Sequence, residues 1–147
     1  MARRAFFSFE YEHDVSRANV VRQSGMTKGF EAAGYVDATE FEKVKRRGDA
    51  AIQEWIDDQL TGTSVTVVLV GADTCSSKWV QYEIDKSIKR GNGLLGVDIS
   101  QINDLQGNTT TCCGSIPKGY DFYRWFSDKG YENLGTWIEK AAKAAEK

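Results

Sequence analysis

Histidine, cysteine and proline are scarce in this chain of 147 residues, and each scarcity excludes a kind of site. The only histidine is His13, so neither a Ser-His-Asp triad nor a zinc site has enough ligands, and we interpret it as an exposed loop residue. The three cysteines, Cys75, Cys112 and Cys113, are odd in number, two are adjacent and none forms a CxxC motif. They argue against a disulfide framework. We expect no metal ion and no bound cofactor.

No charge of one sign dominates the sequence. The net charge is -2, which points to neither nucleic acid nor an anionic membrane as a partner. The basic segment KVKRR at 43–47 is typical of a solvated loop or helix start. No apolar run approaches the ~18 residues of a membrane span, and Arg3 and Arg4 precede no secretory apolar region. We therefore expect a cytoplasmic protein.

Glycine-rich phosphate motifs are missing where they would be informative. No GxGxxG follows the first predicted strand and no GxxxxGK[ST] is present, so dinucleotide binding of the Rossmann type and P-loop chemistry lack support. A response-regulator receiver domain is a rival on fold, because acids follow the first strand and Asp73 follows the central one. A receiver domain also needs a lysine followed by proline later in the sequence, and this pair is absent, since Ile116 precedes Pro117.

Apolar segments do alternate with amphipathic ones. The clearest is TSVTVVLVG at 63–71, whose nearly continuous β-branched run predicts a central parallel strand. The other predicted strands are 4–11, 34–38, 92–100 and an edge strand at 120–126, and the predicted helices are 14–24 (capped by Asp14), 49–60, 76–91 and 133–147. Polar segments at 39–48 and 102–119 are predicted as loops. The order predicts one domain over 1–147, an α/β fold of flavodoxin type with about five parallel strands flanked by helices.

The segment WVQYEIDKSI places Trp79 four residues before Glu83 on a predicted helix. Val80, Ile84 and Ile88 form the stripe expected to face the sheet, and a turn of ~100° per residue puts Glu83 at its flank. Ligands of such sheets bind at the carboxyl ends of the strands, near the start of this helix. Glu83 is therefore either a site carboxylate or a solvated acid beside Lys86.

The combination of FFSFEYEHD and SVTVVLVGADTCSSKWVQYEI resembles a TIR-type domain, and more narrowly the TIR-like proteins of Thoeris anti-phage defence. The resemblance covers most of residues 1–100. It implies that Glu83 acts catalytically on NAD as a substrate, cleaving the bond between nicotinamide and ribose. Product formation then gives a cyclic ADP-ribose isomer, a signal that activates a partner effector without direct contact.

Five further residues are candidates for binding NAD. Phe7 and Ser8 end the first strand, Asn19 lies in the first helix, and Asp37 ends the predicted second strand. Trp79 either stacks on a ring of the substrate or packs its helix against the sheet.

Two alternatives stay open. A plain hydrolase would release ADP-ribose, and a non-catalytic TIR module would only assemble with other TIR domains and would not need Glu83. The presence of Glu83 favours an enzyme. A flavodoxin-like binder of a small ligand is a third reading of the same fold.

Overall fold

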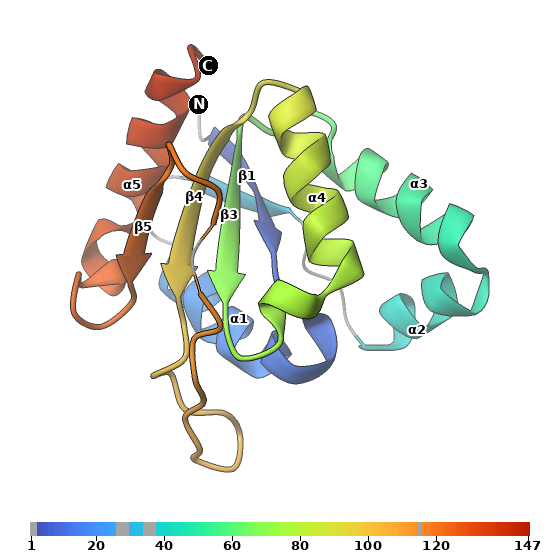
Figure 1. Cartoon of the computed structure of the whole chain (residues 1–147), viewed down its shortest axis with the longest axis horizontal. Coiled ribbons are helices and arrows are strands. Elements are labelled where there is room, and N and C mark those ends of the chain that lie inside the picture. The colour runs from blue at the N-terminus through green and yellow to red at the C-terminus, as the bar shows by residue number, and fades with distance from the viewer. Residues whose placement is uncertain (1–2, 26–29, 34–37, 115) are drawn as a thin grey trace.

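Five parallel strands form one sheet in the order β2-β1-β3-β4-β5. The computed structural model describes residues 3–25, 30–33, 38–114 and 116–147 (Figure 1). The strands are β1 (Arg3–Ser8), β2 (Phe30–Ala33), β3 (Val65–Val70), β4 (Gly93–Asp98) and β5 (Asp121–Arg124). The helices are α1 (Tyr11–Gly25), α2 (Ala38–Arg46), α3 (Asp49–Leu60), the short 3-10 helix η1 (Thr74–Ser76), α4 (Lys78–Lys89) and α5 (Gly130–Ala144). The strand order is that of flavodoxin-like folds, and the predicted fold class is confirmed.

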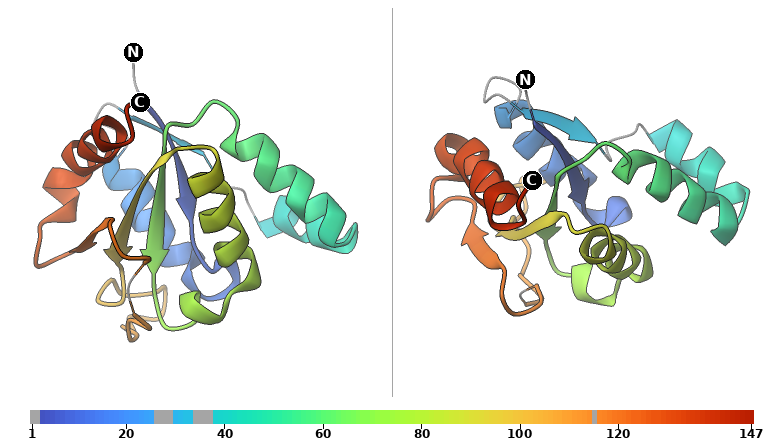
Figure 2. Two further views of the ribbon diagram at one scale, coloured as in Figure 1. Left: turned by 45° about the horizontal axis from the view of Figure 1, so that its top comes forward. Right: turned by 90° about the horizontal axis from the view of Figure 1, so that it is seen from above.

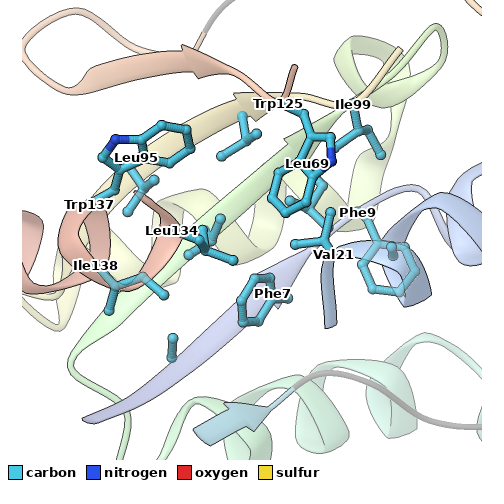
Figure 3. Close-up of a cluster of buried hydrophobic side chains, with 14 of the residues drawn as sticks. Phe7, Phe9, Val21, Leu69, Leu95, Ile99, Trp125, Leu134, Trp137 and Ile138 are labelled. Carbon is cyan, nitrogen blue, oxygen red and sulfur yellow. The ribbon is translucent and has the colours of Figure 1, made fainter. Parts of the chain in front are cut away.

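Helices cover both faces of the sheet (Figure 2). Because side chains alternate along a strand, Phe7, Val67 and Leu95 point to one face and pack with Leu134 of α5 and Val21 of α1 (Figure 3). The opposite face is covered by α3 and α4, whose side chains pack on residues of the other parity, including Phe6, Val68 and Leu94. All six residues of β3 are buried, as a strand covered on both faces requires.

A buried ion pair ties the start of α1 to the loop after β4. Arg17 donates from Nε to the carbonyl of Ile102 (2.8 Å) and from Nη2 to that of Asn108 (2.9 Å). Its Nη1 lies 3.2 Å from Asp14 Oδ1, and both side chains are almost fully buried. The long segment after β4 is therefore anchored to the body of the protein at its base.

Three predicted elements need correction. The helix predicted from Asp14 begins at Tyr11, so Asp14 is a buried residue inside α1 and not its cap. The polar segment 39–48 was predicted as a loop but is mostly the helix α2, because its Glu, Lys and Arg residues favour helix and Val44 packs against the core. The second strand is Phe30–Ala33, while 34–37 of the predicted strand lie outside the described residues.

A disulfide joins Cys75 to Cys113, and Cys112 is free. This corrects the expectation that the cysteines do not pair. The pairing depends on contacts between segments 38 residues apart, because the backbone amide of Cys113 donates to the carbonyl of Gly71 and brings the late loop beside η1. In the part of the chain that the structure describes, no helix is long and apolar enough to cross a bilayer.

Candidate active site

The inward face of α4 carries polar side chains among the apolar ones. Ser77 caps the helix by accepting a hydrogen bond from the Val80 amide (3.3 Å). The buried residues of the helix are Val80, Glu83, Ile84 and Ser87. Ile88, expected to face the sheet, is 41% exposed, whereas Glu83 is only 7% exposed. The helix is thus rotated so that Glu83 points inward, further than its predicted place at the flank.

Hydrogen bonds to the sheet explain this rotation. Ser8, at the end of β1 and fully buried, donates from Oγ to Glu83 Oε1 at 2.7 Å. One turn along α4, the Ser87 hydroxyl donates to the Glu83 carbonyl (2.7 Å) and lies 2.6 Å from Thr66 Oγ1 of β3. Buried polar groups need such partners, so these contacts fix the rotation of the helix as well as the direction of the carboxyl group.

Burial changes the acidity of Glu83. Removal from water raises the pKa of its carboxyl group from 4.5 to about 8, and the hydrogen bond from Ser8 opposes this only in part. At neutral pH the group is therefore mostly protonated in the free protein. A cation placed beside it would favour its ionised form.

Glu83 borders a cavity of about 290 Å³ at the carboxyl ends of the strands. Its walls come from the end of β1, the start of α1, and from α2, α3 and α4. The lining residues are Phe7, Phe9, Glu10, Tyr11, Glu12, Lys45, Ile52, Trp55, Ile56, Ser77, Lys78, Trp79 and Glu83. Seven of these side chains are apolar or aromatic and six are polar or charged, and a concave site that combines both kinds suits a small molecule.

Trp79 both lines the cavity and packs against the core. It contacts the cluster of Phe6, Ile52, Ile56 and Leu60. Its ring also meets that of Tyr82 edge to face, with centroids 5.8 Å apart. These contacts favour packing as one role of the indole, and they leave one side of Trp79 at the cavity.

Charged side chains surround the cavity in pairs. Lys45 Nζ lies 2.6 Å from Glu12 Oε1, and Lys78 Nζ lies 2.6 Å from Asp49 Oδ2. His13 Nδ1 lies 2.6 Å from Glu10 Oε2, and this contact with Glu10 raises the pKa of the imidazole. His13 is exposed as predicted, although it lies in the first turn of α1 and not in a loop.

The predicted site residues separate into two groups. Ser8, Trp79 and Phe7 come together around Glu83, but the ring of Phe7 is 1% exposed and belongs to the core on the α1 and α5 side (Figure 3). Asn19 is half-buried in α1 and is not among the described residues that line this cavity. Asp37 lies outside the described residues.

Sequence reasoning missed the contribution of α2 and α3 to the cavity. Ile52, Trp55 and Ile56 form the apolar stripe of α3, which the sequence indicates only as a core face. Lys45 belongs to a segment that was predicted as a loop. The one signal for this wall was Trp55, a large aromatic residue in a helix that otherwise buries aliphatic ones.

Replacing Ser8 by alanine is expected to leave the fold intact and to raise the pKa of Glu83 further. The carboxyl group of Glu83 loses the hydrogen bond that favours its ionised form. The pH titration of the Glu83 carboxyl group, followed by NMR, should move to higher pH. Ser76→Ala is the matched control, because Ser76 is an exposed serine that bonds only the Asp73 carbonyl. An unchanged pH profile in Ser8→Ala would contradict the positioning role of Ser8.

Comparison with known proteins agrees with the resemblance seen in the motifs. Residues 6–104 match the family described as "Thoeris protein ThsB, TIR-like domain". The chain is also similar to "Putative cyclic ADP-D-ribose synthase ThsB1" of Bacillus cereus (strain MSX-D12), with 41% identity over 139 residues. That alignment covers 93% of this chain and 72% of the relative. The chain therefore belongs to the ThsB family of Thoeris proteins, whose members carry a TIR-like domain.

Proposed function

We propose that this protein cleaves the bond between nicotinamide and ribose in NAD and closes the remaining ADP-ribose into a cyclic isomer. The observation that carries the proposal is Glu83, a buried carboxyl group held by Ser8 at a cavity with aromatic walls. The Bacillus cereus relative is named a "Putative cyclic ADP-D-ribose synthase", and this supports the same reaction for this chain.

Binding of NAD would ionise the catalytic group. The nicotinamide ring of NAD carries a positive charge, and aromatic side chains such as Trp55, Trp79 and Tyr11 at the cavity suit a flat cationic ring. Placing that charge beside Glu83 lowers the pKa of its carboxyl group from about 8 toward its ordinary range. The carboxylate is then formed where the substrate needs it.

Bond cleavage requires no general acid. The bond from the ribose carbon C1′ to nitrogen breaks with both electrons going to the nicotinamide ring, which becomes neutral and leaves without a proton. C1′ acquires the character of an oxocarbenium ion. The negative charge of Glu83 stabilises this centre, as carboxylates do in glycoside cleavage. A site whose only nearby histidine is on the exposed start of α1 can therefore perform this step.

The acceptor decides the product. A hydroxyl group of the adenosine ribose in the same molecule forms a new bond to C1′ and gives a cyclic isomer, whereas water gives ADP-ribose. In both cases the attacking oxygen loses one proton, and Glu83 can accept it because its pKa in the emptied site returns to about 8. Glu83 keeps that proton in the free protein and releases it to water when the next NAD binds.

The cyclic product would be a signal in anti-phage defence, and its receptor would be a separate effector protein. Membership of the ThsB family supports this role. Neither nucleic acid nor a membrane is part of the proposal. Communication through a diffusible product requires no contact between the two proteins.

The test is NAD turnover in cells that express the wild type or Glu83→Gln, with and without phage infection, resolved by mass spectrometry. We expect loss of NAD and a new species with the mass of ADP-ribose less water, both only with the wild type. ADP-ribose as the sole product would mean a hydrolase. If Glu83→Gln consumed NAD as fast as the wild type, or if neither did so with or without infection, the proposal would be wrong.

A further inference from the structure

The cavity beside Glu83 is small for a dinucleotide. Its volume of about 290 Å³ lies near the lower limit of small-molecule sites, which span roughly 300–1,000 Å³. A nicotinamide ring and its ribose fill a space of this size. The remaining adenosine and the diphosphate of NAD must then lie at the mouth of the cavity, where they meet whatever side chains stand there.

Two lysines from different helices stand at that mouth. Lys45 comes from α2 and Lys78 is the first residue of α4, and both line the cavity. Lys45 is 35% exposed and Lys78 is 67% exposed, so both ammonium groups are within reach of a ligand at the mouth. The Lys78 ammonium group also lies over the ring of Trp79, 4.8 Å from the ring centroid. Trp79 itself lines the cavity beside Glu83.

Both ammonium groups form ion pairs with carboxylates of the protein. Lys78 Nζ is 2.6 Å from Asp49, and Lys45 Nζ is 2.6 Å from Glu12 and 3.8 Å from Glu42. These pairs lie at the surface, where ion pairs contribute little to stability. A phosphate group of the NAD diphosphate can therefore replace a carboxylate at each lysine with little loss, because it also carries one negative charge and two terminal acceptor oxygens.

Two acids at the start of α1, Glu10 and Glu12, also line the cavity, and Glu12 loses its partner when a phosphate replaces it at Lys45. Glu10 lies 2.6 Å from His13, whose pKa is raised by that contact, so part of the Glu10 charge is balanced. The single negative charge of Glu83 would face the cationic nicotinamide ring and not the phosphates.

We propose that Lys78 and Lys45 bind the diphosphate of NAD at the mouth of the cavity, displacing Asp49 and Glu12, while the nicotinamide and its ribose occupy the cavity beside Glu83. This inference rests on the proposed function, since it takes NAD as the ligand. It also explains how the two ends of ADP-ribose could meet when the cyclic product forms. With the diphosphate held at the mouth, the adenosine half stays outside the cavity and is free to turn back toward C1′.

The test measures binding apart from turnover. Every protein carries Glu83→Gln, which prevents consumption of the ligand, and isothermal titration calorimetry compares NAD with nicotinamide riboside, which has no phosphate. Adding Lys78→Met or Lys45→Met is expected to weaken NAD binding about tenfold, the usual effect of losing a charged hydrogen bond, and to leave riboside binding unchanged. Adding Lys89→Met, an exposed lysine at the other end of α4, should change neither.

Asp49→Asn gives a change of opposite sign. It frees Lys78 from its carboxylate, so NAD binding should tighten by about twofold to threefold. A purely structural role of the Lys78–Asp49 pair would make both variants weaker binders. Unchanged NAD binding in the two lysine variants, or equal weakening for NAD and the riboside, would overturn the inference.

The two proposals fail in different ways. If Glu83 is needed for NAD loss but the lysine variants bind NAD like their parent, only the placement of the diphosphate is wrong. If the lysines govern NAD binding but the wild type does not consume NAD, only the proposed reaction is wrong. If Glu83→Gln binds nicotinamide riboside but not NAD, the placement is wrong whatever the reaction.

Discussion

Replacing Glu83 by glutamine is expected to reduce NAD cleavage by about a thousandfold or more and, at alkaline pH, to make the protein more stable than the wild type. The loss of activity follows from the proposed mechanism, in which the charge of Glu83 stabilises the oxocarbenium centre. The gain in stability follows from burial, because glutamine never ionises and can still accept the hydrogen bond from Ser8.

The sign of the stability change comes from the pKa of Glu83. In the folded protein it is raised to about 8, while in the unfolded chain it is close to the ordinary value of 4.5. Between these values the folded state holds a proton that the unfolded state has lost, so the free energy of unfolding falls as pH rises. Each pH unit across that interval contributes about 1.4 kcal/mol, and the wild type should therefore lose several kcal/mol in all.

Urea unfolding at pH 5 and pH 9 measures this difference. We expect nearly equal midpoints for wild type and Glu83→Gln at pH 5, and a higher midpoint for the variant at pH 9. Asp85→Asn is the matched control, since Asp85 is an exposed acid of the same helix. A difference between wild type and Glu83→Gln that stays constant across pH would show that burial does not raise the pKa of Glu83 above its value in the unfolded chain. The wild-type kcat/KM should rise with pH through about 8.

The sequence predicted best those elements whose pattern is local. β3 is a continuous β-branched run, and α5 repeats its apolar residues at helical spacing, so both were placed correctly to within a few residues. α2 was missed because its many charged residues are also typical of a solvated loop. Among its described side chains, Val44 packs against the core.

The candidate site was predicted in part for the same reason. Trp79 and Glu83 are close in sequence, so their helix spacing was visible. The inward direction of Glu83 depends on its bond from Ser8 and on the contact of Ser87 with Thr66, and both Ser8 and Thr66 belong to strands distant in the chain. Tertiary contacts likewise bring Trp55 of α3 to the wall of the cavity. They also bring Cys75 and Cys113 together. Such contacts leave no spacing rule in a single sequence.

Replacing Arg17 by methionine is expected to destabilise the protein by about 3–5 kcal/mol, the usual effect of breaking a buried ion pair. Arg17 is 4% exposed, and the structure directs its guanidinium group to Ile102, Asn108 and Asp14. Without it, the Asp14 carboxyl group stays buried with its other oxygen already lacking a hydrogen-bond partner in the described structure. The melting temperature should fall by roughly 10 °C for a domain of this size.

A second substitution distinguishes the buried charge from simple loss of packing. Asp14→Asn added to Arg17→Met removes the unpaired carboxylate, so the double variant should be more stable at neutral pH than Arg17→Met alone. Arg4→Met is the control, since Arg4 makes an exposed hydrogen bond to the Thr61 carbonyl and should matter by less than about 1 kcal/mol. Because neither Asp14 nor Arg17 lines the cavity, NAD cleavage should persist in these variants well below their melting temperatures. Equal stability of the single and double Arg17 variants would mean that the charge of Asp14 is not what Arg17 compensates, and that the arginine acts only as an anchor for the loop after β4.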